Sequence, residues 1–307
     1  MIKAVGIDIG GTNIKAGIVD FEGRIIDFST IATSTWLETK DFISQLMQLM
    51  RQYHSGNIIG YGIAIPGLLS WDRHTPLDVT AIPDLDNTTL YDLLVSVFPG
   101  KKICLENDSN AATLAEFLFS PEKSNHSFLL VTMGTGIGSG LIFQDRIFIG
   151  ANGNALELGE TISGNGEKLE HRIGIEGIKR LANARLLNFT GNSLLKKFPE
   201  ITVKDIITCA CSGDVLAQTI LHEAGEILGE ALVNFIRLFD ITNIAVGGGI
   251  CDGFPFIKPG IEKVFQERLT KYYLGKIQLH KARYGNNAGI MGAASLCFKD
   301  YIQCRKF

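Results

Sequence analysis

The sequence predicts an α/β protein made of two related halves, for three reasons. Each half begins with an apolar strand, a glycine turn, a second strand, a polar turn and a third strand. Glycine clusters directly follow apolar strands at three places in the chain. With 307 residues, the chain is also long enough for two domains that each bury a hydrophobic core.

The elements of the first half follow from apolar runs bounded by turn residues. Strands are expected at 4–9, 14–19, 24–30 and 58–65, and a helix near 39–53. In the second half, strands are expected at 128–133 and 139–143, on either side of a glycine turn at 134–138. The matching order of elements is a weak internal repeat and predicts two halves of similar structure.

The later segments are mainly helical. Apolar residues at helical spacing predict a long helix at 213–239, and a last helix is expected at 289–302. We expect a smaller domain at 1–118, joined by a C-terminal helix at 290–307, and a larger domain at 119–289. Because no linker rich in proline, glycine or serine separates them, close packing and a ligand site in the cleft between them are expected.

The composition excludes several classes of protein. A formal charge of −3, without a basic run, gives no reason to expect a nucleic acid partner. The first residues lack the apolar stretch of a signal peptide. The uncharged segment 127–144 approaches the length of a membrane span, but its alternating glycines favour a loop. We therefore expect a cytoplasmic protein without a membrane partner.

The six cysteines have irregular spacing, which predicts free thiols in a reducing compartment. Cys209 and Cys211 could suggest a metal site, but no second pair of Cys or His residues lies near them in the sequence. Cysteines of the core or of a helix end are the better interpretation.

The glycine clusters indicate close approach of the backbone to a ligand. Strand-adjacent glycines are entropically costly, and turns that direct successive N–H groups to one point bind anions. The hydroxyl groups of Thr12 and Thr135 would add donors. Neither of the first two loops is a Walker or dinucleotide motif, because a strand rather than a helix is expected after each. Plain turns are the alternative for any one cluster, but three clusters in duplicated halves favour a phosphate site.

Two carboxylates have candidate roles in phosphate chemistry. Asp8 ends the first strand beside a glycine loop, so we assign it to Mg²⁺, directly or through water; a turn cap is the alternative. Asp108 lies in the polar run 106–110, between a strand and a helix. This run could be a simple N-cap cluster. A helix N-terminus also keeps a carboxylate ionised, as a base for a hydroxyl proton requires.

With these motifs taken together, the chain resembles the ROK family (repressors, open reading frames, sugar kinases) over nearly its whole length. The matching segments are 8–15, 65–67, 106–112, 134–138, 150–153, 247–249 and 288–293. The resemblance implies an actin/hexokinase-like (ribonuclease H-like) duplicated two-domain fold with a central cleft. It also implies ATP and Mg²⁺, transfer to a hexose hydroxyl, usually the 6-OH, and a homodimer or higher homo-oligomer.

The resemblance also assigns residues. It implies Asp108 as the catalytic base, and Asn107, Glu157 and Gly67 as sugar-binding residues. The residues expected to bind the nucleotide are Asp8, Gly10, Gly11, Thr12, Lys15, Thr135, Gly136, Gly248 and Gly249.

The departures from the family concern the sugar side. Members usually have a His at the position of Glu160 and a later cysteine run, which together bind a structural zinc ion. Both are absent, so we predict no zinc site and expect Glu160 to contact the sugar as an acceptor. Glu170 aligns with a third sugar-binding acid, and Ala81 stands where an Asn is usual.

The sequence therefore predicts an ATP-dependent hexose kinase acting on the 6-hydroxyl of glucose or a related aldohexose. One alternative is a kinase that acts on a β-glucoside. Another is a non-catalytic or sensory sugar- or nucleotide-binding protein. A DNA-binding repressor is disfavoured, because no basic recognition helix is evident. A filament-forming ATPase would leave the sugar-site segments unexplained.

Overall fold

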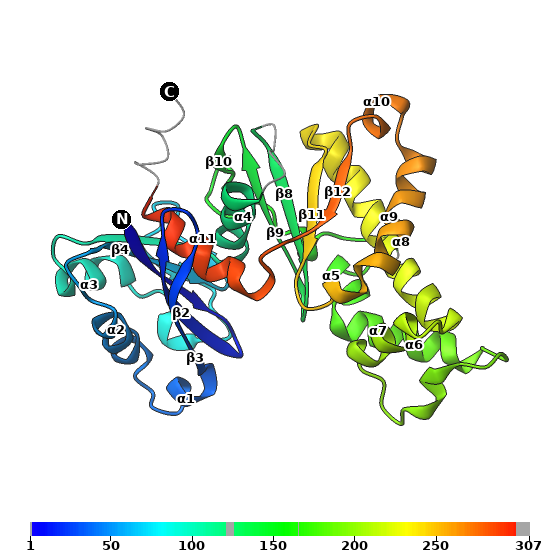
Figure 1. Ribbon diagram of the computed structural model, residues 1–307, viewed down its shortest axis with the longest axis horizontal. Coiled ribbons are helices and arrows are strands. Elements are labelled where there is room, and N and C mark those ends of the chain that lie inside the picture. The colour runs from blue at the N-terminus through cyan, green and yellow to red at the C-terminus, as the bar shows by residue number, and fades with distance from the viewer. Residues whose placement is uncertain (1, 121–125, 165, 299–307) are drawn as a thin grey trace. The chain divides into compact units, whose positions relative to one another are not determined.

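The computed structural model describes residues 2–120, 126–164 and 166–298 (Figure 1). These residues divide into two compact units. The first unit takes its described residues from 1–123, 140–156 and 286–307, and the second from 124–139 and 157–285. In the part of the chain that is described, no helix is both long and apolar enough to span a bilayer.

The first sheet has five strands in the order β3-β2-β1-β4-β7. β1 pairs antiparallel with β2 and parallel with β4, which in turn pairs parallel with β7. Its strands are β1 (Lys3–Ile9), β2 (Asn13–Asp20), β3 (Ile25–Ala32), β4 (Ile58–Ile65) and β7 (Lys102–Asn107). A small antiparallel pair, β5 (Leu68–Leu69) and β6 (Pro76–Leu77), follows β4.

The second sheet repeats this order as β10-β9-β8-β11-β12. β8 pairs parallel with β11, and β11 with β12, whereas β10 is antiparallel to β9. The strands are β8 (Phe128–Met133), β9 (Ile137–Phe143), β10 (Arg146–Ile147), β11 (Asn243–Gly247) and β12 (Gln278–Lys281). The equal strand order in the two sheets confirms the internal repeat that the sequence predicts.

The helices follow the apolar patterns of the chain. Those before the second sheet are α1 (Thr33–Leu37), α2 (Phe42–Gln52), α3 (Leu90–Val97), α4 (Asp108–Phe119) and the 3₁₀ turn η1 (Pro83–Leu85). Those between β10 and β11 are α5 (Leu169–Ile173), α6 (Ile175–Leu187), α7 (Val203–Cys211), α8 (Val215–Phe239), η2 (Leu158–Glu160) and η3 (Leu194–Lys197). The remainder are η4 (Cys251–Gly253), α9 (Phe254–Arg268), α10 (Lys271–Leu274), η5 (Gly285–Asn287) and α11 (Ala288–Leu296).

The two faces of β1 pack in different ways, because side chains alternate along a strand. Val5, Ile7 and Ile9 enter a hydrophobic core cluster with residues of α2 and α3. Ala4 and Gly6 face α11, which is drawn in red beside β1 in Figure 1. A Cβ at Gly6 would collide with the carbonyl oxygen of Ile290, so the absence of a side chain lets the helix backbone reach the sheet.

Most predicted elements are confirmed, with shifts of a few residues at their ends. β4 and β8 have the predicted bounds, and both early glycine loops are followed by strands rather than helices. The predicted helix at 39–53 begins later, at Phe42, because Asp41 caps it by accepting the Ser44 N–H. The last helix ends at Leu296, with Cys297 as its C-cap, earlier than predicted, and the predicted residues 299–307 lie outside the described chain.

The five cysteines that the structure describes are thiols that form no disulfide bond, in line with their irregular spacing. Cys209 is buried and Cys211 is exposed at the end of α7, as expected for core and helix-end residues.

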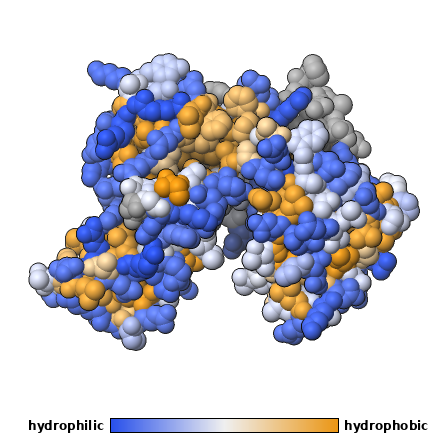
Figure 2. Space-filling model, turned by 180° about the vertical axis from the view of Figure 1, so that it is seen from behind, coloured by the Kyte–Doolittle hydropathy of each residue, from blue (hydrophilic) through white to orange (hydrophobic). Residues whose placement is uncertain are grey.

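On the face shown in Figure 2, hydrophilic residues lie between the apolar ones. The exposed large apolar residues Leu187 and Leu238 belong to different helices, α6 and α8.

Gly62→Ala tests the close contact between β4 and α11. A Cβ at Gly62 would collide with the carbonyl oxygen of Ala293, and a backbone atom cannot move aside as a flexible side chain does. We expect the free energy of unfolding to fall by about 3 kcal/mol, as for overpacked cores. Urea unfolding of the purified variant measures this change.

The matched control is Gly56→Ala, because no atom lies within 4 Å of the position that its Cβ would take. That change should leave stability unchanged, or raise it by about 0.5 kcal/mol through a smaller entropy of the unfolded chain. Equal midpoints for the Gly62 and Gly56 variants would contradict the proposed packing of α11.

Candidate functional site

The parallel strands of the first sheet bring several predicted site residues to one edge. Asp8 pairs with Ala64, and Ile65 pairs with Asn107, so β1, β4 and β7 end close together. Gly67 follows β4, and Asp108 follows β7. Ligands of open α/β sheets bind outside the carboxyl ends of such strands. The first unit therefore gathers Asp8, Gly67, Asn107 and Asp108 at an edge suited to binding.

The turn from β7 into α4 is fixed by side-chain caps. Asn107 Oδ1 accepts the N–H groups of Ser109 and Asn110, at 2.9 and 3.1 Å, and so caps α4. Its Nδ2 donates to the Gly67 carbonyl at 3.1 Å. Asp108 is the first residue of the helix, and its Oδ1 accepts the Ser109 N–H at 2.7 Å. The N-cap interpretation thus holds for Asn107, and Asp108 gains the favourable field of a helix N-terminus.

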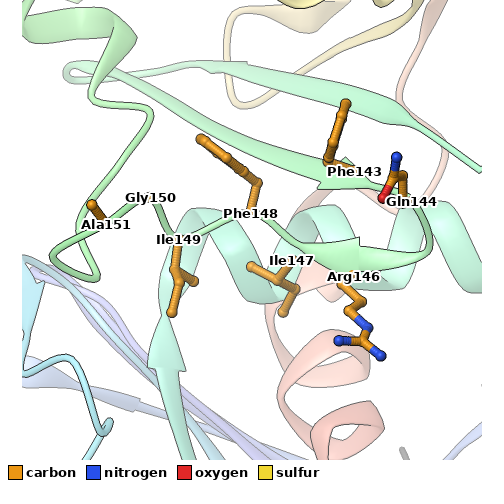
Figure 3. A pocket seen from close by; sticks show the side chains of 8 residues that line it. All are labelled: Phe143, Gln144, Arg146, Ile147, Phe148, Ile149, Gly150 and Ala151. Carbon is orange, nitrogen blue, oxygen red and sulfur yellow. The ribbon is translucent and has the colours of Figure 1, made fainter.

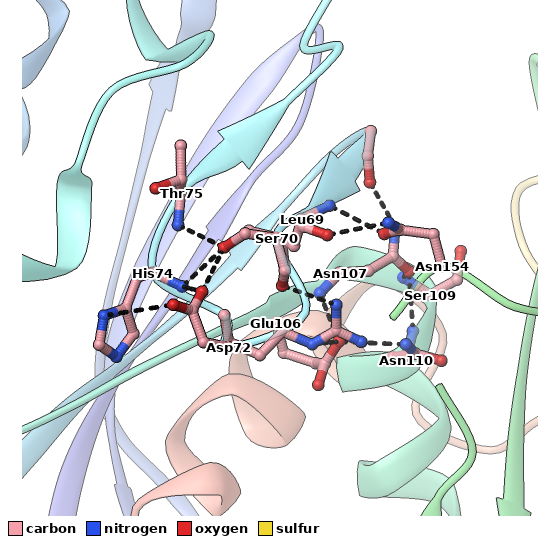
Figure 4. A network of polar contacts seen from close by, with 12 residues as sticks. Leu69, Ser70, Asp72, His74, Thr75, Glu106, Asn107, Ser109, Asn110 and Asn154 are labelled. Atoms are coloured by element: carbon pink, nitrogen blue, oxygen red, sulfur yellow. Dashed lines mark hydrogen bonds and ion pairs between the residues drawn. The ribbon is translucent and has the colours of Figure 1, made fainter. Parts of the chain in front are cut away.

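A buried polar network lies behind this turn and was not predicted (Figure 4). Glu106 Oε1 accepts the Asn107 N–H at 2.9 Å and Asn110 Nδ2 at 3.1 Å. Arg73 forms an ion pair with the same oxygen, with Nε at 3.3 Å. Arg73 and Glu106 lie far apart along the sequence, so no local pattern indicated that they form a pair.

Asp8 lies in a confined position against the start of α11. Its carboxylate is 3.7 Å from Lys15 Nζ, which also donates to the Asn286 carbonyl at 3.0 Å. A Cβ at Gly289 would collide with this carboxylate, so glycine leaves the space that Asp8 fills. Burial raises the pKa of Asp8, while Lys15 opposes the rise. The second strand thus supplies a cation to Asp8 directly across the hairpin.

The first glycine loop closes the β1–β2 hairpin. Gly10 N–H donates to the Asn13 carbonyl at 3.0 Å, and Thr33 Oγ1 donates to the Gly10 carbonyl at 2.6 Å. Gly11 and Thr12 are exposed. A Cβ at Gly11 would lie 3.6 Å from the Ala81 Cβ, which is an ordinary contact. The loop therefore presents open backbone, and Ala81 is its neighbour.

The second and third glycine loops meet at one edge of the second sheet. They follow the parallel neighbours β8 and β11, and a Cβ at Gly248 would collide with the backbone of Met133, at the end of β8. Gly248 also has a φ of 88°, a conformation that favours glycine. By contrast, at Gly134 and Gly249 no atom lies within 4 Å of the position that a Cβ would take. Protein packing therefore does not explain glycine at these two positions.

Gly136 has a different explanation. A Cβ there would meet Glu170 Oε2 at 2.5 Å, so the glycine makes room for a carboxylate of α5. Thr135 lies beside it, and a Cβ at Gly174 would meet the Thr135 carbonyl oxygen at 2.7 Å. The second loop is thus packed against the start of α5 and α6 on one side.

The three predicted sugar-binding glutamates gather in the second unit. Burial and the charges of Glu160 and Glu170 raise the pKa of Glu157. Lys168 Nζ contacts Glu160 Oε2, and this hydrogen bond lowers the pKa of Glu160. The Lys168 segment is held beside Glu160 by a β-bridge between Ile162 and Lys168. Lys168 is a second residue whose role the sequence did not predict.

The predicted site residues therefore form two groups, one in each unit. Asp8, Gly10, Gly11, Thr12, Lys15, Gly67, Asn107 and Asp108 belong to the first unit, and Thr135, Gly136, Glu157, Glu160, Glu170, Gly248 and Gly249 to the second. Across the described ranges, no three His, Cys, Asp or Glu side chains are arranged to hold a metal ion.

A pocket of about 680 Å³ lies elsewhere in the first unit (Figure 3). It is lined by Phe143, Gln144, Arg146, Ile147, Phe148, Ile149, Gly150 and Ala151. These residues surround the short strand β10, and none of them is a predicted site residue. Its lining mixes apolar side chains with Gln144 and Arg146, a combination that no motif in the sequence indicated.

Lys168→Met tests whether Lys168 lowers the pKa of Glu160. Lys168 lowers the pKa of Glu160 below 4.5, so its stabilising effect is present above that pH and is lost as the pH falls through the lowered pKa. The variant should therefore show a higher pKa for Glu160. It should be less stable than the parent near neutral pH and equally stable well below pH 4.5. Carboxyl NMR titration and urea unfolding at several pH values measure both effects.

Lys179→Met is the control, because Lys179 pairs with Glu176 on α6, at 3.1 Å. It should leave the titration of Glu160 unchanged. An unchanged titration in the Lys168 variant would contradict the pairing with Glu160.

Comparison with known proteins identifies relatives of the whole chain. The ROK family model matches residues 4–300. The glucokinase of Thermotoga maritima is 26% identical, over 96% of this chain and 97% of its own. The β-glucoside kinase of Klebsiella pneumoniae is 28% identical, over 95% of each chain. The xylose repressor of Bacillus subtilis is 27% identical, over 97% of this chain and 78% of its own.

Solved structures agree with this assignment. A protein from Cytophaga hutchinsonii has a TM-score of 0.88 and 34% identity, over 96% of this chain and 99% of its own. A ROK family glucokinase from Streptomyces griseus, solved with glucose and AMPPNP, has a TM-score of 0.78 and 28% identity, over 96% and 98%. These likenesses confirm the predicted hexokinase-like α/β fold. The family match, the curated relatives and the solved structures agree: the chain belongs to the ROK family.

Proposed function

We propose that this chain is a cytoplasmic, ATP-dependent sugar kinase that phosphorylates the 6-hydroxyl of glucose or a related aldohexose. The observation that carries the proposal is the position of Asp108, the first residue of α4, at the sheet edge where Asp8 and Gly67 also lie. Relatives named glucokinase and β-glucoside kinase support a sugar as acceptor.

The acceptor is assigned to polar side chains at fixed positions. Asp108 takes the proton of the attacking hydroxyl, and the N-terminus of α4 favours its ionised form before the transfer. Asn107, whose Nδ2 is bonded to the Gly67 carbonyl, orients the sugar beside the base. Glu157, Glu160 and Glu170 accept hydrogen bonds from ring hydroxyls. Carboxylates suit this role because each oxygen accepts hydrogen bonds from more than one hydroxyl group.

The nucleotide phosphates are assigned to the glycine loops. Gly134 and Gly249 leave open space beside their backbone, as close approach of phosphate oxygens requires, and Gly11 lies in an exposed loop. Thr12 and Thr135 add hydroxyl donors. The AMPPNP complex of the Streptomyces griseus relative supports a nucleoside triphosphate as donor.

The residues of the first unit fit a magnesium ion that arrives with the nucleotide. Mg²⁺ is commonly held by one or two carboxylates together with substrate phosphates, rather than by an all-protein cage. Asp8 offers one carboxylate at the edge of the sheet, and Lys15 lies beside it to balance its charge. Bound there, the ion would neutralise charge on the transferred phosphoryl group. Lys15, on β2, then directs its ammonium group to Asp8 or to phosphate.

Two further functions are supported by particular observations. The Klebsiella pneumoniae relative favours a β-glucoside as the acceptor. The Bacillus subtilis repressor shows that ROK proteins also include regulators, so a sensory sugar-binding protein is the other candidate. Turnover separates these two, because only a kinase releases ADP in the presence of a sugar.

Asp108→Asn tests the assignment of the base. The amide keeps the shape of the side chain but accepts no proton, so we expect kcat to fall about 10²- to 10⁴-fold. ADP release with MgATP is followed against glucose, allose, mannose, N-acetylmannosamine, fructose and a β-glucoside. The KM for ATP should stay unchanged.

Equal rates for the Asn variant and the parent would refute the role of Asp108. If the parent chain binds ATP but turns over no sugar on the panel, the sensory function gains support instead.

Gly134→Ala and Gly249→Ala test the phosphate loops. Because nothing in the protein occupies the space beside either glycine, each variant should unfold at the same urea concentration as the parent or at a slightly higher one. If phosphate uses that space, the KM for ATP should rise about tenfold or more, since a displaced backbone N–H loses a charge-assisted hydrogen bond of about 1.5 kcal/mol. Unchanged ATP kinetics in both variants would remove these two loops from the nucleotide site.

A further inference from the structure

We infer that Arg73, through its buried ion pair with Glu106, is a positioning residue that holds Asn107 and Asp108 in place for the reaction. The inference rests on the proposed function for its catalytic consequence. Its structural part stands on the contacts of the first unit alone.

One oxygen of Glu106 connects this pair to the site. Glu106 Oε1 accepts hydrogen bonds from the Asn107 N–H and from Asn110 Nδ2 (Figure 4). The same oxygen forms the ion pair with Arg73 Nε. Asn107 then uses its own Oδ1 to cap α4, whose first residue is Asp108. A shift of the Glu106 carboxylate would therefore move the backbone of Asn107 and, with it, the start of the helix.

The ion pair is shielded from solvent. The side chains of Arg73 and Glu106 are only 14% and 7% exposed. A buried charge without its partner is strongly unfavourable, whereas the intact pair is tolerated. Of the guanidinium nitrogens, Nε and Nη2 form no hydrogen bond within the described chain, and Nη1 reaches the Ser70 carbonyl only at 3.5 Å. Glu106 is thus the principal partner of the Arg73 charge.

The hairpin between β5 and β6 fixes Arg73 in this position. Arg73 has a φ of 63°, a conformation that is costly for a residue with a side chain. Ser70 Oγ accepts the N–H groups of His74 and Thr75, at 3.1 and 2.9 Å, and donates to Asp72 at 2.6 Å. A strained residue held by so many bonds at the edge of a candidate site indicates a functional constraint.

A neighbouring loop clamps the same hairpin. Asn154 Oδ1 accepts the Leu69 N–H, and its Nδ2 donates to the Leu69 carbonyl, both at 2.9 Å. A Cβ at Gly153 would lie 3.0 Å from Trp71 Cα and 3.3 Å from Arg73 Nη1, so glycine permits this close approach. The hairpin is therefore rigid on both sides of Arg73, as a positioning element requires.

The test compares Arg73→Met with Arg73→Met/Glu106→Gln. Methionine fills similar space but leaves the Glu106 carboxylate buried without its cation. The sugar KM should rise and kcat should fall, so that kcat/KM for the sugar drops about 10- to 100-fold, as small misplacements of reacting groups do. The KM for ATP should not change. Glutamine at position 106 is neutral and keeps an oxygen for Asn107 and Asn110, so the double variant should recover most of the loss.

A second readout does not depend on turnover. In Arg73→Met, the amide hydrogens of Asn107, Ser109 and Asn110 should lose protection against exchange, and the double variant should regain it. Trp71 lies two residues before Arg73, and its fluorescence gives a local signal. Its emission can be distinguished from that of Trp36, the other tryptophan, because Trp71 is 65% exposed and Trp36 is 5% exposed. The emission of Trp71 should shift in the single variant.

Arg185→Met is the matched control, since it breaks the exposed ion pair of α6 with Glu223, at 2.6 Å. It should change neither the sugar KM nor the exchange of residues 107–110. Unchanged exchange and kinetics in Arg73→Met would overturn the inference, and so would a double variant no better than the single one. If the parent phosphorylates no sugar while Arg73→Met still loses protection, the proposed function fails and the positioning role stands.

Discussion

The backbone contact of α11 with the first sheet is the constraint on which the rest of the first unit depends. Gly6 on β1 and Gly62 on β4 lack side chains, and the helix reaches the sheet through Ile290 and Ala293. On its opposite side, Gly292 brings α11 against the Ala111 carbonyl in α4. One helix thus sets the positions of β1, β4 and α4 together. Since Asp8 lies near the end of β1 and Asp108 begins α4, the same contact fixes both candidate carboxylates.

Three carboxylates at or beside the candidate site residues are each paired with a cationic side chain in the same unit. Asp8 is paired with Lys15, Glu106 with Arg73, and Glu160 with Lys168. The three pairs differ in burial. Arg73 and Glu106 are the most shielded, whereas Lys168 and Glu160 have side chains 41% and 47% exposed. The buried pair is therefore suited to hold a fixed geometry, and the exposed pair is suited to adjust when a ligand arrives.

Much of the fold could be predicted from the sequence because its signals are local. Apolar runs bounded by turn residues predict β1, β4 and β8, and the duplicated order of turns predicts two related halves. Asp108 was identifiable from its place between a strand and a helix. Arg73 and Lys168 were not, because an ion pair joins residues far apart along the chain or across an irregular loop. The importance of Arg73 depends on burial and on the oxygen of Glu106 that it shares with Asn107 and Asn110, and neither property has a local pattern in the sequence.

Glycine shows this limit most clearly. In the sequence, the three glycine clusters look alike, and all of them suggest close approach of the backbone to phosphate. In the structure, Gly248 is required by its backbone conformation and by Met133, and Gly136 by the carboxylate of Glu170. Gly134 and Gly249 have no such requirement. A glycine that is needed for packing gives no information about a ligand. A glycine beside open space lowers stability through its conformational entropy, and no contact within the protein explains its presence. The open positions are therefore the stronger argument for a nucleotide, and they lie in the two loops that meet where β8 and β11 end.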